Sequence, residues 1–145
     1  GIRGLPQDHG KAMELWLRAG ELGDAMSYAK IAGASYGGVG VERDEKKTKH
    51  YFELSAMGGY VSARHILGAF EGNAGNIERA MKHFMISAGA GDDHSLTEIR
   101  KGFTKGYVTK DDFEKALRAH KEAKDEMKSD QREAAAAFAA ARGES

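Results

Sequence analysis

The chain has 145 residues, in which 22 Lys and Arg balance 22 Asp and Glu and Cys is absent. A formal net charge of zero provides no global field that would attract nucleic acid or an anionic membrane, so we expect neither as a partner. Without Cys the chain cannot form a disulfide, a thiolate zinc site or a cysteine nucleophile, which fits a reducing, cytoplasmic compartment. No apolar run approaches the roughly 18 residues of a membrane span, and no signal-peptide pattern opens the chain. We therefore expect a soluble fragment of a longer chain.

Three sets of residues recur along the chain in one register. Each set steps by 36, 32 and 36 residues, which predicts tandem structural units of about that length. Within each unit a small residue, a larger side chain and a second small residue follow at intervals of four and three, so they share one face of a helix. The sets are Ala12, Thr48, Ala80 and Ala116; Trp16, Phe52, Phe84 and His120; and Ala19, Ser55, Ser87 and Ala123.

A second helix is predicted before each of the last three of these helices. Ile31, Leu67 and Ile99 keep the 36- and 32-residue steps and mark its buried side. We name the first helix of each pair helix A and the second helix B. In chain order the predicted units span about 5–23, which holds a B helix only, then 24–59, 60–91 and 92–127, all within one repeat domain over 1–145.

Glycines and capping residues mark the predicted helix ends. Three glycines at the ends of B helices suit the left-handed conformation that terminates a helix, namely Gly23, Gly59 and Gly91. Asp44 and Asn76 are predicted to cap the N-termini of two B helices. Thr109 and Asp112 form a T-x-x-D capping box, which predicts that another helix starts there.

The last helix is predicted to be longer than the others. The next position in the glycine series is Met127, so the stop signal is missing and we expect one helix over 112–142, about 46 Å long at ~1.5 Å per residue. Its second half either projects past the repeats or folds over their end as a cap. The same half is a strong helix former because it is rich in Ala. Alternatively, Met127, Ala134 and Phe138 form an apolar stripe for self-association with a second copy.

Several segments resemble the Sel1-like repeat, a relative of the tetratricopeptide repeat. They are KAMELWLRAGELG, YGGVGVERDEKKTKHYFELSAMGG and GNIERAMKHFMISAGAG, and the resemblance covers about residues 8–124. The matching features are Leu67-Gly68 in helix A, the G-x-G-V loop over 38–41, the Asp44 cap, Lys11-Ala12, Tyr51-Phe52 and Gly59. The chain departs from the family pattern at Ala32, where glycine is expected, in the shortened third loop, and in a fourth unit that keeps only the outline.

The resemblance implies an all-α, right-handed superhelix of about 3.5 helical hairpins that serves as a scaffold or adaptor in protein complexes. Enzymatic activity is not implied. Some proteins join similar repeats to a RING or MYND zinc module, where the repeats resemble the substrate-recognition part of a ubiquitin ligase, and this stays an alternative. A structural or assembly subunit that uses the C-terminal helix is a second alternative, and a hydrolase is a third.

The residues indicate no catalytic, cofactor or metal site. The six histidines show no recognised ligand spacing, and His120 takes the place of a packing ring in its helix. Four serines lie at helical positions without a G-x-S-x-G elbow, namely Ser27, Ser55, Ser62 and Ser87. The G-G-V-G-V loop lacks the strand and the G-K-S/T ending of a phosphate-binding loop.

The default binding surface of a repeat array is its concave face, because successive units present side chains there at regular spacing. The A helices are expected to line this face, with their exposed positions pointing away from Ile31, Leu67 and Ile99. We predict a protein partner at these positions, although the same side chains could merely solvate the face or pack between units. The candidates are Tyr28, Lys30, Arg64, His65, Phe70 and Glu71.

Overall fold

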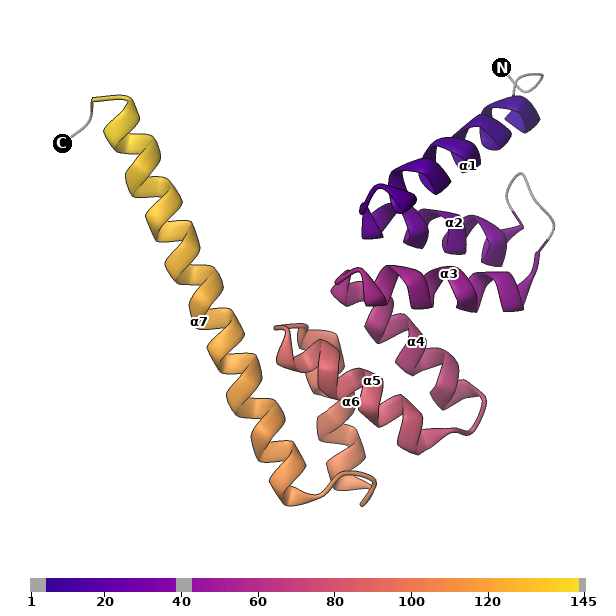
Figure 1. Ribbon diagram of the computed structural model, residues 1–145. Coiled ribbons are helices and arrows are strands. Elements are labelled where there is room, and N and C mark those ends of the chain that lie inside the picture. Colours follow the sequence, from indigo (N-terminus) through magenta and orange to yellow (C-terminus); the bar gives the residue numbers. More distant parts are fainter. Residues whose placement is uncertain (1–4, 39–42, 144–145) are drawn as a thin grey trace. The chain divides into compact units, whose positions relative to one another are not determined.

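The computed structural model describes residues 5–38 and 43–143 and shows seven helices and no strand among them (Figure 1). The fold is therefore all-α, as predicted. Residues 39–42 lie outside the described residues, and they include all of the expected G-x-G-V loop except Gly38. The helices are α1 (Leu5–Glu21), α2 (Ala25–Gly37), α3 (Glu45–Met57), α4 (Val61–Asn73), α5 (Ile77–Gly89), α6 (Asp93–Thr104) and α7 (Lys110–Ala141).

The helix order matches the predicted repeat. Helices α2, α4 and α6 are the A helices, and α1, α3, α5 and α7 are the B helices. The chain divides into two compact units, Gly1–His83 and Phe84–Ser145, and the division falls inside α5. Each unit is described by itself below.

The glycines at the B-helix ends confirm the predicted stop signals. Gly23, Gly59 and Gly91 have φ values of 108°, 96° and 102°, which favour glycine. At each end the residue after the glycine donates its backbone N–H to the carbonyl of the second small residue of the repeat, as Asp24 does to Ala19 at 2.9 Å. The small residues therefore lie where the chain turns from one helix into the next.

The predicted N-terminal caps also lie where the sequence places them. Asp44 accepts the backbone N–H of Lys47 at 3.0 Å, and Thr109 Oγ1 accepts that of Asp112 at 3.1 Å. Asn76 directly precedes α5. Each capping side chain accepts a hydrogen bond from a backbone N–H that has no partner within the helix and would otherwise bond to water.

In the unit Gly1–His83, α2 packs against α1 and α3, and α3 packs against α4 (Figure 1). Ile31 and Leu67 are 2% and 1% exposed, so the predicted buried side of these A helices is confirmed. Ala32, the position where the resemblance led us to expect glycine, is fully buried in the same core. Phe52 of the ring column is also buried, whereas Trp16 is half-buried. Complete burial of a side chain such as Leu67 stabilises the fold by about 2 kcal/mol.

In the unit Phe84–Ser145, α7 packs against α6 through its first half. The ring of Phe113 stacks on that of Phe103 with centroids 4.7 Å apart, and Ala116 is 2% exposed. A Cβ added at Gly91 would lie 2.8 Å from the methyl carbon of Met127. The side chain of Met127 therefore occupies the space beside Gly91. Met127 itself stands at the repeat position where the earlier B helices end in glycine.

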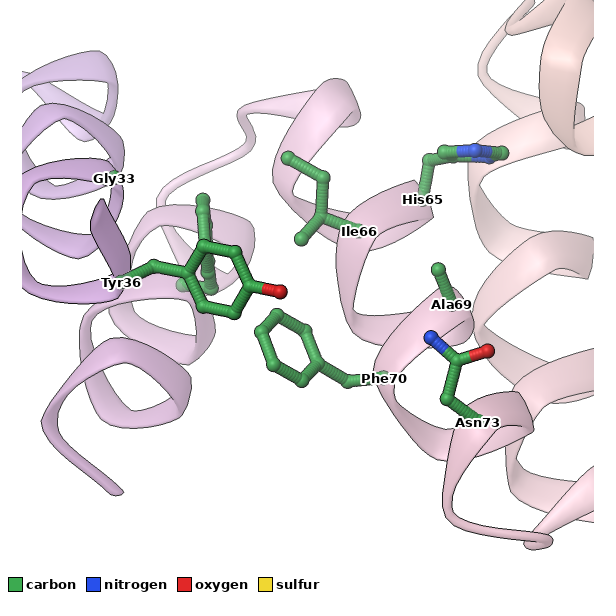
Figure 2. A pocket seen from close by; sticks show the side chains of 8 residues that line it. Gly33, Tyr36, His65, Ile66, Ala69, Phe70 and Asn73 are labelled. Atoms are coloured by element: carbon green, nitrogen blue, oxygen red, sulfur yellow. The ribbon is translucent and has the colours of Figure 1, made fainter. Parts of the chain in front are cut away.

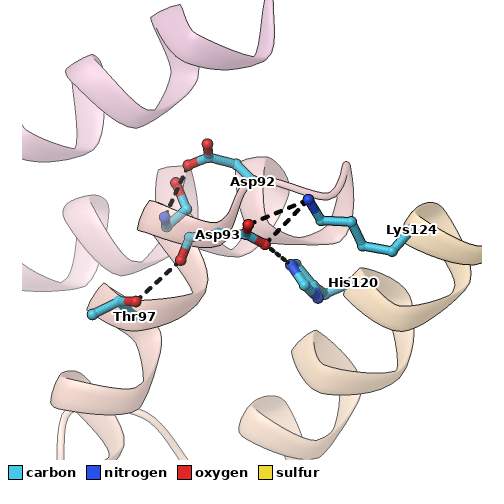
Figure 3. Close-up of polar contacts among 6 residues, drawn as sticks. Asp92, Asp93, Thr97, His120 and Lys124 are labelled. Carbon is cyan, nitrogen blue, oxygen red and sulfur yellow. Dashed lines mark hydrogen bonds and ion pairs between the residues drawn. The ribbon is translucent and has the colours of Figure 1, made fainter. Parts of the chain in front are cut away.

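A polar contact also joins α6 to α7 (Figure 3). His120 Nε2 lies 2.7 Å from Asp93 Oδ1, and the Lys124 ammonium lies 3.3 Å from the same carboxylate. The hydrogen bonds from His120 and Lys124 keep the pKa of Asp93 below its ordinary value. His120 occupies the ring column, and its mostly buried imidazole serves packing and this contact together.

The second half of α7 confirms the prediction of one long helix. The helix has 32 residues, about 48 Å at ~1.5 Å per residue, and its bounds agree with the predicted 112–142 to within two residues. The residues over 128–138 are all exposed. Phe138 is 62% exposed, and the guanidinium of Arg142 lies 4.7 Å from the centre of its ring.

Candidate protein-interaction site

An apolar pocket of about 460 Å³ opens between the two A helices of the first compact unit (Figure 2). Helix α2 provides one wall, α4 provides the other, and a residue of α3 contributes from below. The pocket is within the usual size range of ligand-binding clefts in proteins. The lining residues are Gly33, Tyr36, Phe52, His65, Ile66, Ala69, Phe70 and Asn73.

Aromatic rings from three helices form one end of this pocket. The rings of Tyr36 and Phe70 meet edge to face with centroids 5.8 Å apart, and those of Phe52 and Phe70 are 6.2 Å apart. Phe52 is buried and Phe70 is half-buried, whereas Tyr36 is 47% exposed. Because edge-to-face pairs are favourable beyond their buried area, the rings hold one another in place. The exposed ring of Tyr36 is thus held in place as a wall of the pocket before another molecule binds.

Small residues keep the middle of the pocket open. Gly33 on α2 and Ala69 on α4 are both exposed, and a Cβ added at Gly33 would meet no atom within 4 Å. They lie one helical turn from Tyr36 and from Asn73 respectively, so each shares a face with a lining residue. Backbone of another molecule can therefore approach both helices closely.

Three of the six predicted partner-binding residues lie where a partner could reach them. His65 and Phe70 line the pocket, and Lys30 is exposed on α2. Figure 2 shows the His65 and Phe70 side chains on the same wall of the pocket, both carried by α4.

Glu71 is not exposed, and this corrects the expectation from the sequence. It is 5% exposed and accepts hydrogen bonds from Lys49 at 2.9 Å and from the Asn76 amide at 2.8 Å. These two donors keep the pKa of Glu71 below its ordinary value, which favours the ionised carboxylate, and each of its oxygens accepts one of the two hydrogen bonds. Its role in the structure is to tie α4 to α3 and to the start of α5.

Tyr28 and Arg64 also differ from the exposed positions that we expected, because both are half-buried and engaged within the unit. The Tyr28 ring stacks on that of Tyr51 with centroids 6.0 Å apart, and the Arg64 guanidinium lies 3.5 Å from His83 Nδ1. Burial, and then the charge of Arg64, lowers the pKa of His83, which favours its neutral form.

Helical phase explains these three differences. Glu71 follows Leu67 by four residues, while Arg64 and Tyr28 precede Leu67 and Ile31 by three. Residues at these spacings share a helix face, so all three turn toward the buried side.

The predicted partner-binding set missed six of the eight lining residues, namely Gly33, Tyr36, Phe52, Ile66, Ala69 and Asn73, of which Phe52 was assigned to core packing. The periodic signal that could have found Ala69 and Asn73 was their spacing from His65, which steps by four along one face of the helix.

Basic side chains border this site near Phe70 and Tyr36. The Arg43 guanidinium lies 4.7 Å from the centre of the Tyr36 ring, and Lys46 and Lys49 line a smaller hollow that shares Phe70 with the pocket. Arg43 pairs with Glu45 at 3.3 Å, but both side chains are more than half exposed, so this pair adds little stability.

No group of three or more His, Cys, Asp or Glu that could hold a metal ion is found among the described residues. Within the same part of the chain, no helix has both the length and the apolar character needed to cross a bilayer. The arrangement is a mostly apolar, ring-lined surface with room for side chains of another molecule.

Comparison with known proteins identifies the repeat. The family model of the Sel1 repeat matches residues 1–24 and 25–60. Residues 1–60 of the chain therefore match two tandem Sel1 repeats. The crystal structure of a Sel1 repeat protein from Oxalobacter formigenes resembles it with a TM-score of 0.63 and 26% sequence identity, over 80% of this chain and 49% of that chain. The chain thus spans about half the length of that relative. No curated protein matches.

The Sel1 repeat assignment confirms the fold class and the family that the sequence indicated. Sel1 repeats generally mediate protein–protein interaction, and their proteins are typically non-catalytic scaffolds. The matched segments contain α1, α2 and α3, which include one wall and the base of the pocket.

Proposed function

We propose that this Sel1-like chain is a non-catalytic interaction module that holds a segment of a partner protein against the surface of α2 and α4, the face expected to be concave. The observation that carries the proposal is the ring-lined pocket between these two helices. An exposed apolar cleft with a few polar groups at its edge is the usual form of a binding site on a soluble protein.

The surface is also well prepared for binding in energetic terms. Its rings are already held by neighbouring rings within the unit, so little side-chain freedom is lost when a partner arrives. Tyr36 is a large, partly exposed amphipathic ring, and such residues dominate the binding energy of interfaces.

Capture of a partner by matched variants tests this proposal. Ala69→Arg places a long side chain in the open middle of the pocket, and Lys82→Glu changes an exposed charge on α5 that does not line it. We expect the wild type and Lys82→Glu to retain the same protein from a cell extract, identified by mass spectrometry, and Ala69→Arg to lose it. Thermal unfolding of all three should agree. A partner retained equally by Ala69→Arg would refute this site.

A second candidate function is an assembly subunit that associates through α7. The observation in its favour is the fully exposed stretch over 128–138, which ends on the exposed ring of Phe138. Sedimentation velocity of the chain and of Phe138→Ala tests it, because loss of the ring should shift any dimer toward monomer. A wild type that remains monomeric at high concentration would remove this alternative.

A further inference from the structure

We propose that Phe138 on α7 of one copy of this chain enters the pocket between α2 and α4 of a second copy. The inference rests on the proposed function, because it names the segment that the pocket would hold as residues 134–141 of another copy. It joins two exposed apolar features of the same chain, the ring-lined pocket and the last turns of α7.

The last turns of α7 carry one aromatic ring on an uncharged helix surface. Residues 134–141 are all Ala except for Phe138. Phe138 is 62% exposed, more than any other Phe, Tyr or Trp side chain in the described part of the chain. Because the side chains around it are methyl groups, the ring protrudes from the helix and the surface of another molecule can reach it.

The contact of this ring with Arg142 does not prevent docking. The guanidinium lies 4.7 Å from the ring centre, and both side chains belong to exposed residues near the end of α7. A cation–π contact at an exposed site stabilises less than the removal of a phenyl ring from water. The ring therefore gains more from burial in an apolar pocket than it loses if Arg142 moves away.

The pocket has the lining and the opening that such a ring needs. Tyr36 and Phe70 meet edge to face, and a third ring can extend this arrangement toward Ile66. In Figure 2 the side chains of these three residues converge on the cavity from the two helices. Gly33 and Ala69 keep the middle of the pocket open, so a helix covered only by Ala methyl groups can approach α2 and α4 closely.

The charges beside the pocket are balanced, which favours an uncharged occupant. The basic side chains at this edge are offset by acidic ones: Arg43 is paired with Glu45, Lys49 is paired with Glu71, and the exposed Lys46 has the exposed Asp44 two residues before it. A balanced border attracts neither an acidic nor a basic ligand. A charged segment would lose hydration here without gaining an opposite charge, whereas residues 134–141 bring no charge to the pocket.

The other exposed rings outside the pocket match it less well. Phe103 is stacked on Phe113 within its own unit. Tyr107 lies in the turn between α6 and α7, with a lysine two residues before it and another three residues after it, so its segment would bring charge. Among the described residues, Phe138 combines high exposure with uncharged surroundings.

The expected association is weak. One ring on two turns of helix buries far less surface than a standard protein interface, so we expect a Kd of about 100 µM. Copies of the chain then associate only in concentrated solution, and an unfolding experiment at low micromolar concentration measures the monomer.

Sedimentation velocity at increasing concentration, from roughly 10 to 500 µM, tests the contact from both sides. On α7, Ala134→Glu puts a charge one turn before Phe138 on the same face, and Ala136→Glu puts the same charge on the opposite face. On the pocket, Ala69→Arg fills the open middle, and Lys82→Glu changes an exposed residue of α5 that does not line it.

We expect the wild type, Ala136→Glu and Lys82→Glu to associate alike. Ala134→Glu, Ala69→Arg and Phe138→Ala should each raise the Kd at least about 10-fold, because each removes or obstructs the buried ring. In dilute solution all variants should have the thermal unfolding and helix content of the wild type. A wild type that is monomeric throughout this range, or an equal loss from Ala134→Glu and Ala136→Glu, would overturn the inference.

Mixing of two variants tests whether the ring and the pocket belong to different copies. Phe138→Ala keeps its pocket and Ala69→Arg keeps its ring, so in isothermal titration calorimetry these two should bind each other although neither associates with itself. Phe138→Ala mixed with Ala134→Glu, which both lack a usable ring, should show no binding. Failure of the first pair to bind, or self-association of Ala69→Arg, would refute the pairing of ring and pocket.

The outcome also separates this inference from the proposed function. A different protein that the wild type captures from a cell extract and Ala69→Arg loses, together with a wild type that stays monomeric, would keep the interaction module and refute the second copy as its occupant. Full self-association and full capture by Ala69→Arg would remove both.

Discussion

Two buried serines in the first compact unit should respond to the same substitution with opposite signs. Ser35 on α2 and Ser55 on α3 are both helical and 0% exposed. The Ser55 hydroxyl donates to the backbone carbonyl of Ala25 at 2.6 Å and so joins α3 to the start of α2. The Ser35 hydroxyl has no hydrogen-bond partner among the described residues. Replacement of each by Ala removes one oxygen from an otherwise similar place.

The magnitudes follow from what each hydroxyl does. Ser55→Ala loses a buried hydrogen bond, which costs about 1 kcal/mol, and it leaves a small void. Ser35→Ala removes a group whose burial without a partner costs about 1 kcal/mol, so this variant should be more stable by a similar amount. The helix propensity gained from Ser to Ala, about 0.5 kcal/mol, is common to both and cancels in the comparison. The two variants should therefore differ by about 2 kcal/mol.

Urea unfolding followed by circular dichroism measures this difference. The midpoint should rise for Ser35→Ala and fall for Ser55→Ala relative to the wild type, with unchanged slopes. A Ser35→Ala variant that is less stable than the wild type would show that its hydroxyl is paired. Equal midpoints for the two variants would refute the reasoning from hydrogen bonding.

Four further predictions follow from the fold. Gly33→Ala should raise stability by about 0.5–1 kcal/mol in urea unfolding, because the position is helical and has room for a methyl group. Gly20→Ala should lower it by about 1–3 kcal/mol, because its Cβ would lie 2.6 Å from the Tyr28 ring. Because the pKa of Glu71 is lowered in the folded state, its carboxylate adds to the free energy of unfolding above its unfolded pKa of about 4.3, and this stabilisation is lost as the pH falls through the folded pKa. Glu71→Gln should therefore make the stability fall less steeply toward low pH when unfolding is measured from roughly pH 3 to 7. Deletion of 128–145 should leave the thermal unfolding of the rest unchanged, whereas a lowered midpoint would reveal packing by the second half of α7.

The architecture could be predicted from the sequence because its signals repeat. A buried aliphatic residue in each A helix, a small residue on each side of a larger one in each B helix, and a glycine at each B-helix end recur in phase. Each of these features has one local physical reason, such as the positive φ at Gly59 or the side-chain cap at Asp44. Because each weak local signal occurs several times in the same register, the helix order could be predicted from the sequence. The helix bounds could be predicted to within a few residues.

The site was less predictable because it depends on phase and on neighbouring helices. An error of about 100° in the phase of α4 is enough to exchange Glu71 for Phe70, and charge alone made Glu71 look like a surface residue. Its burial depends on Lys49, 22 residues earlier, and no periodic pattern announces that pair. The Tyr36 ring likewise becomes part of a site only because Phe70 of the next repeat packs edge to face against it.

At Gly33 the proposed interaction site sets stability against access. Neither its backbone nor its surroundings require glycine: it lies inside α2, its φ is not positive, and a Cβ there would meet nothing. At two other glycines the structure does show a reason: a Cβ would meet the Tyr28 ring at Gly20 and the Met127 side chain at Gly91. A helix that carries an exposed glycine forgoes about 0.5–1 kcal/mol relative to Ala. Without a side chain at Gly33, the backbone of another molecule can come close to α2, next to the rings of Tyr36 and Phe70. This access is the physical advantage of glycine at the position.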